Sequence, residues 1–129
     1  EEGMVLGEHG ENQVPVFSNL SVDVPEAVRE EVLLGLRGSS MPVIKGKGGT
    51  VFGPAYHIFN MMQKIGKGEE FICSLPANGA YGIDGCSIGL PARVTRDGAK
   101  INENLKLDDW ETAKLNAAAE FLTGLCRRV

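Results

Sequence analysis

The chain has 129 residues, of which 43% are hydrophobic and 23% are charged, and its formal net charge is −4. That length fits one domain with a real core, the mild acidity argues against binding to nucleic acid or an anionic membrane, and no apolar run approaches the ~20 residues that span a bilayer. The three cysteines are odd in number and lack zinc-site spacing, which favours a reduced, cytoplasmic protein.

The first third of the chain predicts two strands and a helix. Residues 4–6 are a short apolar run that ends at a glycine, and residues 14–22 predict a second strand. Asp23 is the expected cap of the helix, because an aspartate side chain can bond to the free N–H groups of a first turn. Residues 36–49 contain four glycines and a proline, which oppose a regular helix there. The apolar stripe predicted for the helix is Val28, Val32, Leu33 and Leu36.

The middle of the chain predicts a second helix and two more strands. Thr50 is the expected cap of this helix, Pro54 is tolerated because it lies in the first turn, and Gly66 ends the run. The strands are predicted over residues 69–75 and 86–95. The apolar residues at helical spacing are Phe52, Ala55, Tyr56, Phe59 and Met62.

The last third predicts a hairpin and a long helix. Residues 96–99 contain an Asp-Gly pair that suits a tight turn, and Asp108 and Glu111 have the spacing of a capping box. Because the strands cluster through hairpin-type connections, the predicted class is α+β, with antiparallel strands, a helix after the first strands and a long C-terminal helix. The stripe predicted for the last helix is Trp110, Ala113, Ala117, Ala118, Phe121, Leu122 and Leu125.

One of the two histidines stands in a setting that suits proton transfer. His9 lies between two glycines and two carboxylates, Glu8 and Glu11. The glycines permit a sharp bend that leaves the imidazole approachable, and neighbouring carboxylates favour its protonated form. An exposed turn histidine without a chemical role is the alternative interpretation. The other histidine, His57, is interpreted as a partly packed or surface residue.

The other motifs that could carry chemistry are incomplete. Residues 9–11 have the His-x-Glu spacing of zinc deaminases, but the Pro-Cys-x-x-Cys partner is absent. Residues 46–50 are rich in glycine, but they lack the adjacent Lys and Ser/Thr of a phosphate loop. No Gly-x-Gly-x-x-Gly dinucleotide fingerprint occurs. A metal site on His9 has too few ligands, so no metal is predicted.

Several segments nevertheless resemble one family. Residues 5–18, Val-Leu-Gly-Glu-His-Gly-Glu-Asn-Gln-Val-Pro-Val-Phe-Ser, resemble the active-site loop of lactate and malate dehydrogenases, where a Gly-Glu-His-Gly run precedes a Val-Pro-(Val/Leu)-aromatic-Ser strand. Residues 43–50 resemble the family's Ile-x-x-Lys-Gly-x-Thr segment, and the Gly-Pro-Ala at residues 53–55 is closest to malate dehydrogenases. Residues 79–85 and 87–92 resemble later family segments, in order.

The resemblance implies a function for residues 1–129 as the C-terminal, substrate-binding domain of an NAD-dependent 2-hydroxy-acid dehydrogenase. His9 would donate and accept the proton at the substrate oxygen, which is general acid–base catalysis. Thr50 and Gly49 would lie against the substrate, and Pro54 would pack near the nicotinamide ring. Malate and oxaloacetate are the expected substrates, lactate dehydrogenase is the alternative, and a homo-oligomer is implied for the intact enzyme.

The chain also departs from the family pattern. It has no counterpart of the family's nucleotide-binding Rossmann half, of the aspartate that orients the histidine, or of the arginines that bind the substrate carboxylates. Residues 1–3 show neither an initiator Met nor a signal-peptide pattern, so the chain is expected to be a processed product or a piece of a longer protein. We therefore expect it to need its own N-terminal Rossmann domain as partner and to be inactive alone. A non-catalytic binding or oligomerisation module of the same fold is the alternative.

Overall fold

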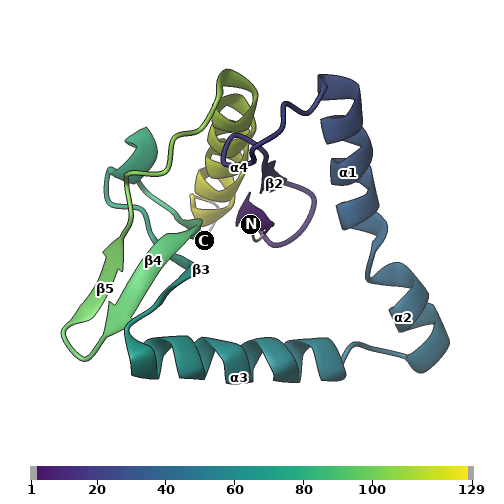
Figure 1. Ribbon diagram of the computed structural model, residues 1–129, viewed down its shortest axis with the longest axis horizontal. Helices are drawn as coiled ribbons and strands as arrows, with labels where there is room; N and C mark the ends of the chain where they lie inside the picture. The colour runs from purple at the N-terminus through teal and green to yellow at the C-terminus, as the bar shows by residue number, and fades with distance from the viewer. Residues whose placement is uncertain (1–2, 128–129) are drawn as a thin grey trace.

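The computed structural model describes residues 3–127, so the first two residues used in the signal-peptide argument lie outside it. Within that range one sheet of five strands is accompanied by four α-helices and a single 3₁₀ turn (Figure 1). The elements are β1 (Met4–Gly7), β2 (Gln13–Val16), α1 (Glu26–Gly38), α2 (Met41–Lys47), α3 (Phe52–Lys67), β3 (Glu70–Pro76), η1 (Ala80–Gly82), β4 (Ser87–Thr95), β5 (Gly98–Ile101) and α4 (Asp109–Cys126).

All the strand pairs in the sheet are antiparallel. The order across it is β2-β1-β4-β3, and β5 pairs with β4 through the predicted hairpin. β1 meets β4 where Gly7 stands opposite Gly89, and a Cβ added to Gly89 would lie 2.8 Å from the Gly7 carbonyl oxygen. Glycine is therefore needed for this close approach. The predicted α+β class, with antiparallel strands and a long C-terminal helix, is confirmed.

The hydrophobic core lies between the sheet and α4. Each large side chain that is fully buried there contributes about 1.5–3 kcal/mol relative to an exposed position. The contact between the sheet and α4 is therefore the main source of apolar stabilisation. Its largest members are Leu6, Val14, Ile88, Leu90 and Leu115.

Helix α4 begins as predicted but buries a different face. The Asp108 side chain accepts a hydrogen bond from the Glu111 N–H (2.9 Å), and the Glu111 carboxylate accepts one from the Asp108 N–H (3.0 Å), which confirms the capping box. The predicted stripe is wrong for four members, because Ala113, Ala117, Phe121 and Leu125 are exposed. Alanines occur on both sides of this helix, so the apolar pattern did not single out one face. The buried residues are Glu111, Leu115, Ala118 and Ala119.

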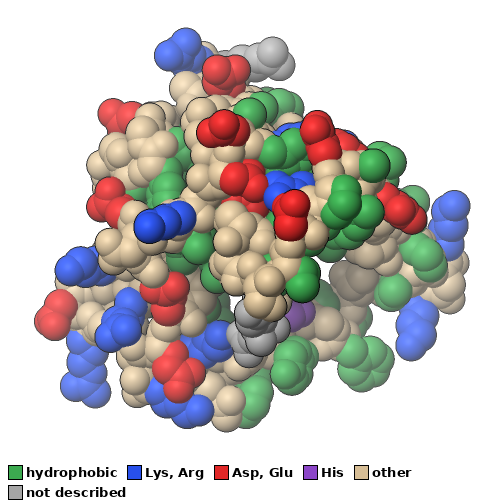
Figure 2. Space-filling model, turned by 45° about the horizontal axis from the view of Figure 1, so that its top comes forward, with side chains coloured by type: hydrophobic (Ala, Val, Ile, Leu, Met, Phe, Trp, Pro, Cys, Tyr) green, Lys and Arg blue, Asp and Glu red, His purple; other side chains and the backbone are tan. Residues whose placement is uncertain are grey.

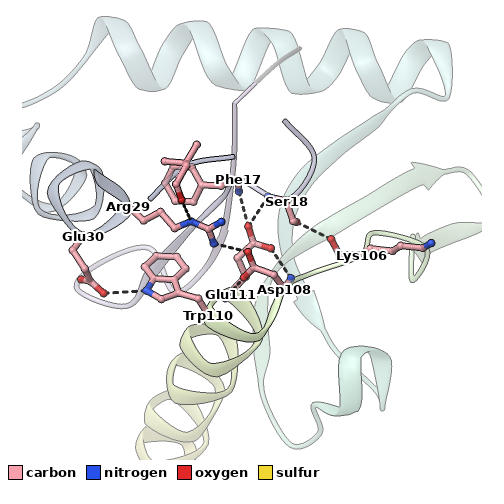
Figure 3. A network of polar contacts seen from close by, with 9 residues as sticks. Phe17, Ser18, Arg29, Glu30, Lys106, Asp108, Trp110 and Glu111 are labelled. Atoms are coloured by element: carbon pink, nitrogen blue, oxygen red, sulfur yellow. Dashed lines mark hydrogen bonds and ion pairs between the residues drawn. The ribbon is translucent and has the colours of Figure 1, made fainter. Parts of the chain in front are cut away.

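A buried carboxylate ties the end of β2 to α4 (Figure 3). Glu111 is fully buried, and its Oε1 accepts hydrogen bonds from the backbone N–H groups of Phe17 (2.6 Å) and Ser18 (2.8 Å). These N–H groups are therefore not free to pair with another strand. The predicted strand over residues 14–22 is for this reason shorter than expected and ends at Val16.

The same network holds α1 against α4 (Figure 3). Arg29 forms a short hydrogen-bonded ion pair with Asp108, and its guanidinium lies 5.3 Å from the centroid of the Phe17 ring and 5.8 Å from that of Trp110. Partial burial alone would raise the pKa of Asp108, but the Glu111 N–H and the Arg29 charge outweigh it and lower that pKa. Asp108 therefore stays ionised at neutral pH and keeps α1 in place.

Helices α1, α2 and α3 extend from the body formed by the sheet and α4, and α3 runs along the lower edge in Figure 1. The apolar stripes predicted on α1 and α3 exist, but they are mostly not buried. In α1, Leu33 is fully buried whereas Val28 and Val32 are 44% and 40% exposed. No described residue of α3 is buried. The exposed members of its predicted stripe are Phe52, Ala55, Tyr56, Phe59 and Met62.

The helix ends differ from the sequence prediction in two places. The N-cap positions are Pro25 for α1 and Val51 for α3, and neither helix has a side-chain cap among the described residues. The predicted caps Asp23 and Thr50 are therefore wrong, because both lie before the position from which a side chain reaches the first turn. α3 also continues through Gly66 to Lys67.

Helix α2 forms in the stretch where glycine and proline opposed a helix. Pro42 lies in its first turn, where the missing N–H would have no intrahelical partner anyway. Gly48 then ends the helix with a left-handed backbone (φ +75°). Pro42 and Gly48 thus mark the two ends of α2, and Gly46 is accommodated within its last turn.

Candidate functional site

The turn between β1 and β2 carries His9. Gly7 has φ +89°, and a Cβ there would lie 2.5 Å from the Asn12 carbonyl oxygen, so only glycine fits. The Glu8 N–H donates to the Asn12 carbonyl (3.1 Å), and the Asn12 N–H donates back to the Glu8 carboxylate (3.0 Å). This closed turn leaves His9 exposed to solvent.

We predict that Gly7→Ala destabilises the chain by about 1–3 kcal/mol, because the new methyl group meets backbone in a left-handed conformation. The matched control is Gly35→Ala, at an exposed α1 position with open space around it, which should stabilise by up to ~1 kcal/mol through helix propensity. Urea unfolding of both variants measures the difference. Equal unfolding midpoints for the two variants would show that the turn does not need glycine.

A cleft of about 1240 Å³ opens between this turn, the end of α1, α2 and the first half of α3. Its lining includes all four residues proposed from the sequence for the site, namely His9, Gly49, Thr50 and Pro54. Gly49 is half-buried and the other three are exposed. In Figure 2, hydrophobic side chains gather around a hollow in which a histidine is visible. The fold thus brings together residues from two separate segments of the chain.

The cleft also contains basic residues that the sequence interpretation did not assign to the site. Arg37 and Lys47 line it together with His57, and among residues 3–127 Glu11 is the one carboxylate in its lining. Such an excess of basic groups favours an anionic ligand. His57 is exposed, as interpreted from the sequence, and its ring packs edge-on against Tyr56 with centroids 5.6 Å apart. Spacing along the chain gave no signal for these residues, because only the packing of the helices brings them to the cleft.

The two carboxylates beside His9 in the sequence have other partners. Glu8 accepts hydrogen bonds from the backbone and side-chain nitrogens of Asn12. Glu11 Oε2 lies 3.9 Å from Arg37 Nε. Within residues 3–127 the structure shows no hydrogen bond to the His9 ring. The predicted effect of these carboxylates on the protonation of the ring stays a prediction, and a hydrogen-bonded group that orients the ring would have to come from outside the described residues.

The remaining candidate chemistry of the chain is limited. Within the described residues, no cluster of three or more His, Cys, Asp or Glu side chains could hold a metal ion. No helix in that range combines the length and hydropathy of a bilayer-spanning segment. Cys73, Cys86 and Cys126 are free thiols, and burial raises the pKa of Cys73, which keeps it protonated at neutral pH.

Comparison with known proteins decides the family. The model of the lactate/malate dehydrogenase alpha/beta C-terminal domain matches residues 1–127. The chain belongs to this family. Among curated members, the malate dehydrogenases of Natronomonas pharaonis and Haloarcula marismortui are each 36% identical over 129 residues, which is 95% of this chain and 42% of each relative. The L-lactate dehydrogenase of Halalkalibacterium halodurans is 30% identical over 93% of this chain and 42% of its own length.

Solved structures of dehydrogenases agree with the family assignment. The malate dehydrogenase of Archaeoglobus fulgidus in complex with NADH matches with a TM-score of 0.82 and 32% identity, over 98% of this chain and 43% of that one. A lactate dehydrogenase from a Medee basin deep-sea metagenome library matches with a TM-score of 0.80 and 28% identity, over 95% of this chain and 44% of that one. The fold predicted from the resemblance is confirmed, and the chain spans about two fifths of the length of these relatives.

Proposed function

We propose that residues 1–129 are the substrate-binding half of an NAD-dependent 2-hydroxy-acid dehydrogenase that interconverts malate and oxaloacetate. The observation that carries this proposal is the cleft that gathers His9, Thr50 and Pro54. Reduction of a 2-keto acid requires a proton donor beside an anion-compatible cavity with an apolar wall. Five relatives at 35–36% identity are named malate dehydrogenase, which supports the substrate. The lactate dehydrogenase relative supports the alternative.

The proposed mechanism gives each residue of the cleft a physical task. His9 donates a proton to the 2-keto oxygen during reduction and takes it back during oxidation, and its exposure lets it exchange that proton with water between turnovers. Thr50 and Gly49 lie against the substrate. Pro54 and the 80% exposed Phe52 offer an apolar surface that fits a nicotinamide ring. NAD, when bound, supplies the hydride chemistry.

The exposed face of α3 supports a second domain as partner. Phe52, Tyr56 and Met62 are each more than 60% exposed, and a contiguous apolar surface of this kind is usually an interaction site. The chain covers 42% of the Natronomonas relative, which leaves the length of a nucleotide-binding half. We propose that this N-terminal Rossmann half covers α3, that the chain alone is inactive, and that the intact enzyme is a homo-oligomer. The free cysteines fit a cytoplasmic location.

The test is a dehydrogenase assay on the chain joined to its upstream coding sequence. With NADH, we expect kcat/KM for oxaloacetate to exceed that for pyruvate by roughly 100-fold or more, and we expect no turnover by residues 1–129 alone. A preference for pyruvate would replace malate by lactate in the proposal. An upstream sequence without a Gly-x-Gly-x-x-Gly unit, together with absent turnover, would favour the binding or oligomerisation module.

A further inference from the structure

A buried guanidinium nitrogen without a partner lies in the wall of the cleft. Arg37, in the last turn of α1, lines the cleft together with His9 and Thr50. Within residues 3–127 its Nε is a buried donor that has no hydrogen-bond acceptor, although the whole side chain is 32% exposed. Buried donors in folded proteins are nearly always paired, so this one indicates a missing acceptor.

The carboxylate that faces Arg37 does not serve as that acceptor. Glu11 Oε2 lies 3.9 Å from Arg37 Nε, which is beyond hydrogen-bond length, and the Glu11 side chain is 83% exposed. A pair this solvated contributes little to stability. Arg37 also lowers the pKa of Glu30, but the main cause of that shift is the hydrogen bond from Lys114. Glu30 is therefore engaged elsewhere.

The other basic groups of the cleft are less suited to a carboxylate. The Lys47 ammonium lies 5.6 Å from the centroid of the Phe52 ring, in a cation–π contact. The His57 ring packs against Tyr56. Arginine also presents a planar fork of N–H groups, which matches the two oxygens of a carboxylate. Arg37 is thus the group in this half that best fits a carboxylate.

We propose that Arg37 binds a carboxylate of the 2-keto acid. In the free protein, the Glu11 carboxylate loosely occupies the position that the substrate carboxylate takes. The identity of the anion rests on the proposed function. A carboxylate that enters the cleft displaces Glu11 into solvent, and rotation of the flexible Arg37 side chain gives Nε its acceptor. Arg37 then contributes substrate binding from α1, in addition to any group of an N-terminal half.

The test is titration of the ¹⁵N-labelled 129-residue chain with malonate, a dicarboxylate that cannot be reduced. We expect a saturable shift of the Arg37 Nε–Hε signal. Arg37→Gln should weaken malonate binding by about tenfold or more, because it removes a charge-assisted contact, and Arg37→Lys should restore part of the affinity. Glu11→Gln should strengthen binding by roughly two- to fivefold, since it removes the competing carboxylate.

The control variant is Arg96→Gln, which removes an equal charge at the exposed β4–β5 turn, outside the residues that line the cleft. An absence of saturable binding would overturn the inference, as would equal losses in Arg37→Gln and Arg96→Gln. A loss of affinity in Glu11→Gln would also overturn it, because Glu11 and Arg37 would then act only as a structural pair. Inorganic phosphate is titrated in parallel. If phosphate binds more tightly than malonate and its binding depends on Arg37, the Arg37 side chain would be assigned to a phosphate ligand and the carboxylate proposal would be overturned.

The malonate titration and the dehydrogenase assay fail independently. If the chain joined to its upstream sequence reduces oxaloacetate but the affinity for malonate is the same with and without Arg37, the inference about Arg37 is wrong and the proposed function stands. If malonate binding depends on Arg37 but no dehydrogenase activity is found, the proposed function falls and the carboxylate site stands. In an active enzyme, Arg37→Gln should raise KM for oxaloacetate by about tenfold with a smaller change in kcat, because it removes ground-state binding.

Discussion

Replacement of His9 by asparagine should lower kcat for oxaloacetate reduction by about 10²–10⁴-fold in the two-domain enzyme proposed above, which is the usual contribution of a positioned acid or base. Asparagine preserves a polar side chain of similar shape, but it cannot carry the proton to the substrate oxygen. The exposed turn that holds His9 has no tight packing around the ring, so the fold should tolerate the change. Steady-state kinetics with NADH and oxaloacetate measures the loss.

The matched control for His9 is the other histidine of the same cleft. His57→Asn removes an imidazole that also lines the cleft but has no assigned part in proton transfer, so kcat should change by only a few fold. Unfolding midpoints of both variants should match the parent enzyme, which separates a chemical loss from a loss of folded protein. Comparable kcat values for the His9→Asn variant and the parent enzyme would refute the proton-transfer role of His9.

The features that the sequence predicted correctly have signals confined to a few neighbouring residues. The capping box pairs Asp108 with Glu111, three positions apart, and the hairpin over residues 96–99 depends on one Asp-Gly pair. The turn that carries His9 is fixed by Gly7 and by hydrogen bonds over four residues. Each such feature is decided by local geometry and does not depend on the rest of the fold.

The features that the sequence did not predict depend on contacts between distant segments. The stripe of α3 has the helical period of a buried face, but its burial requires a surface that these residues do not contain. The early end of β2 depends on Glu111, which is 94 positions from its partner Phe17. Arg37 reaches the cleft because the end of α1 packs beside the turn that carries Glu11. No pattern in one segment of the sequence contains this information.

A second large effect is expected at Glu111, the buried carboxylate that joins β2 to α4. Glu111→Ala should lower the free energy of unfolding by about 3–5 kcal/mol, because it deprives the backbone N–H groups of Phe17, Ser18 and Asp108 of their acceptor. Glu111→Gln should cost less, since its amide oxygen can still accept one of these bonds. Trp110, the only tryptophan, lies beside the network and reports its loss by fluorescence during urea unfolding.

The control for Glu111 is Glu120→Ala on the same helix. Glu120 is exposed, so its removal should change stability by no more than about 0.5 kcal/mol. A Glu111→Ala variant as stable as this control would show that water replaces the carboxylate at no cost. The expected loss is a large share of the 5–15 kcal/mol that stabilises a typical domain. Because β2 leads directly from the turn that carries His9, the variant should also loosen the cleft, and it should do so without altering any residue that lines it.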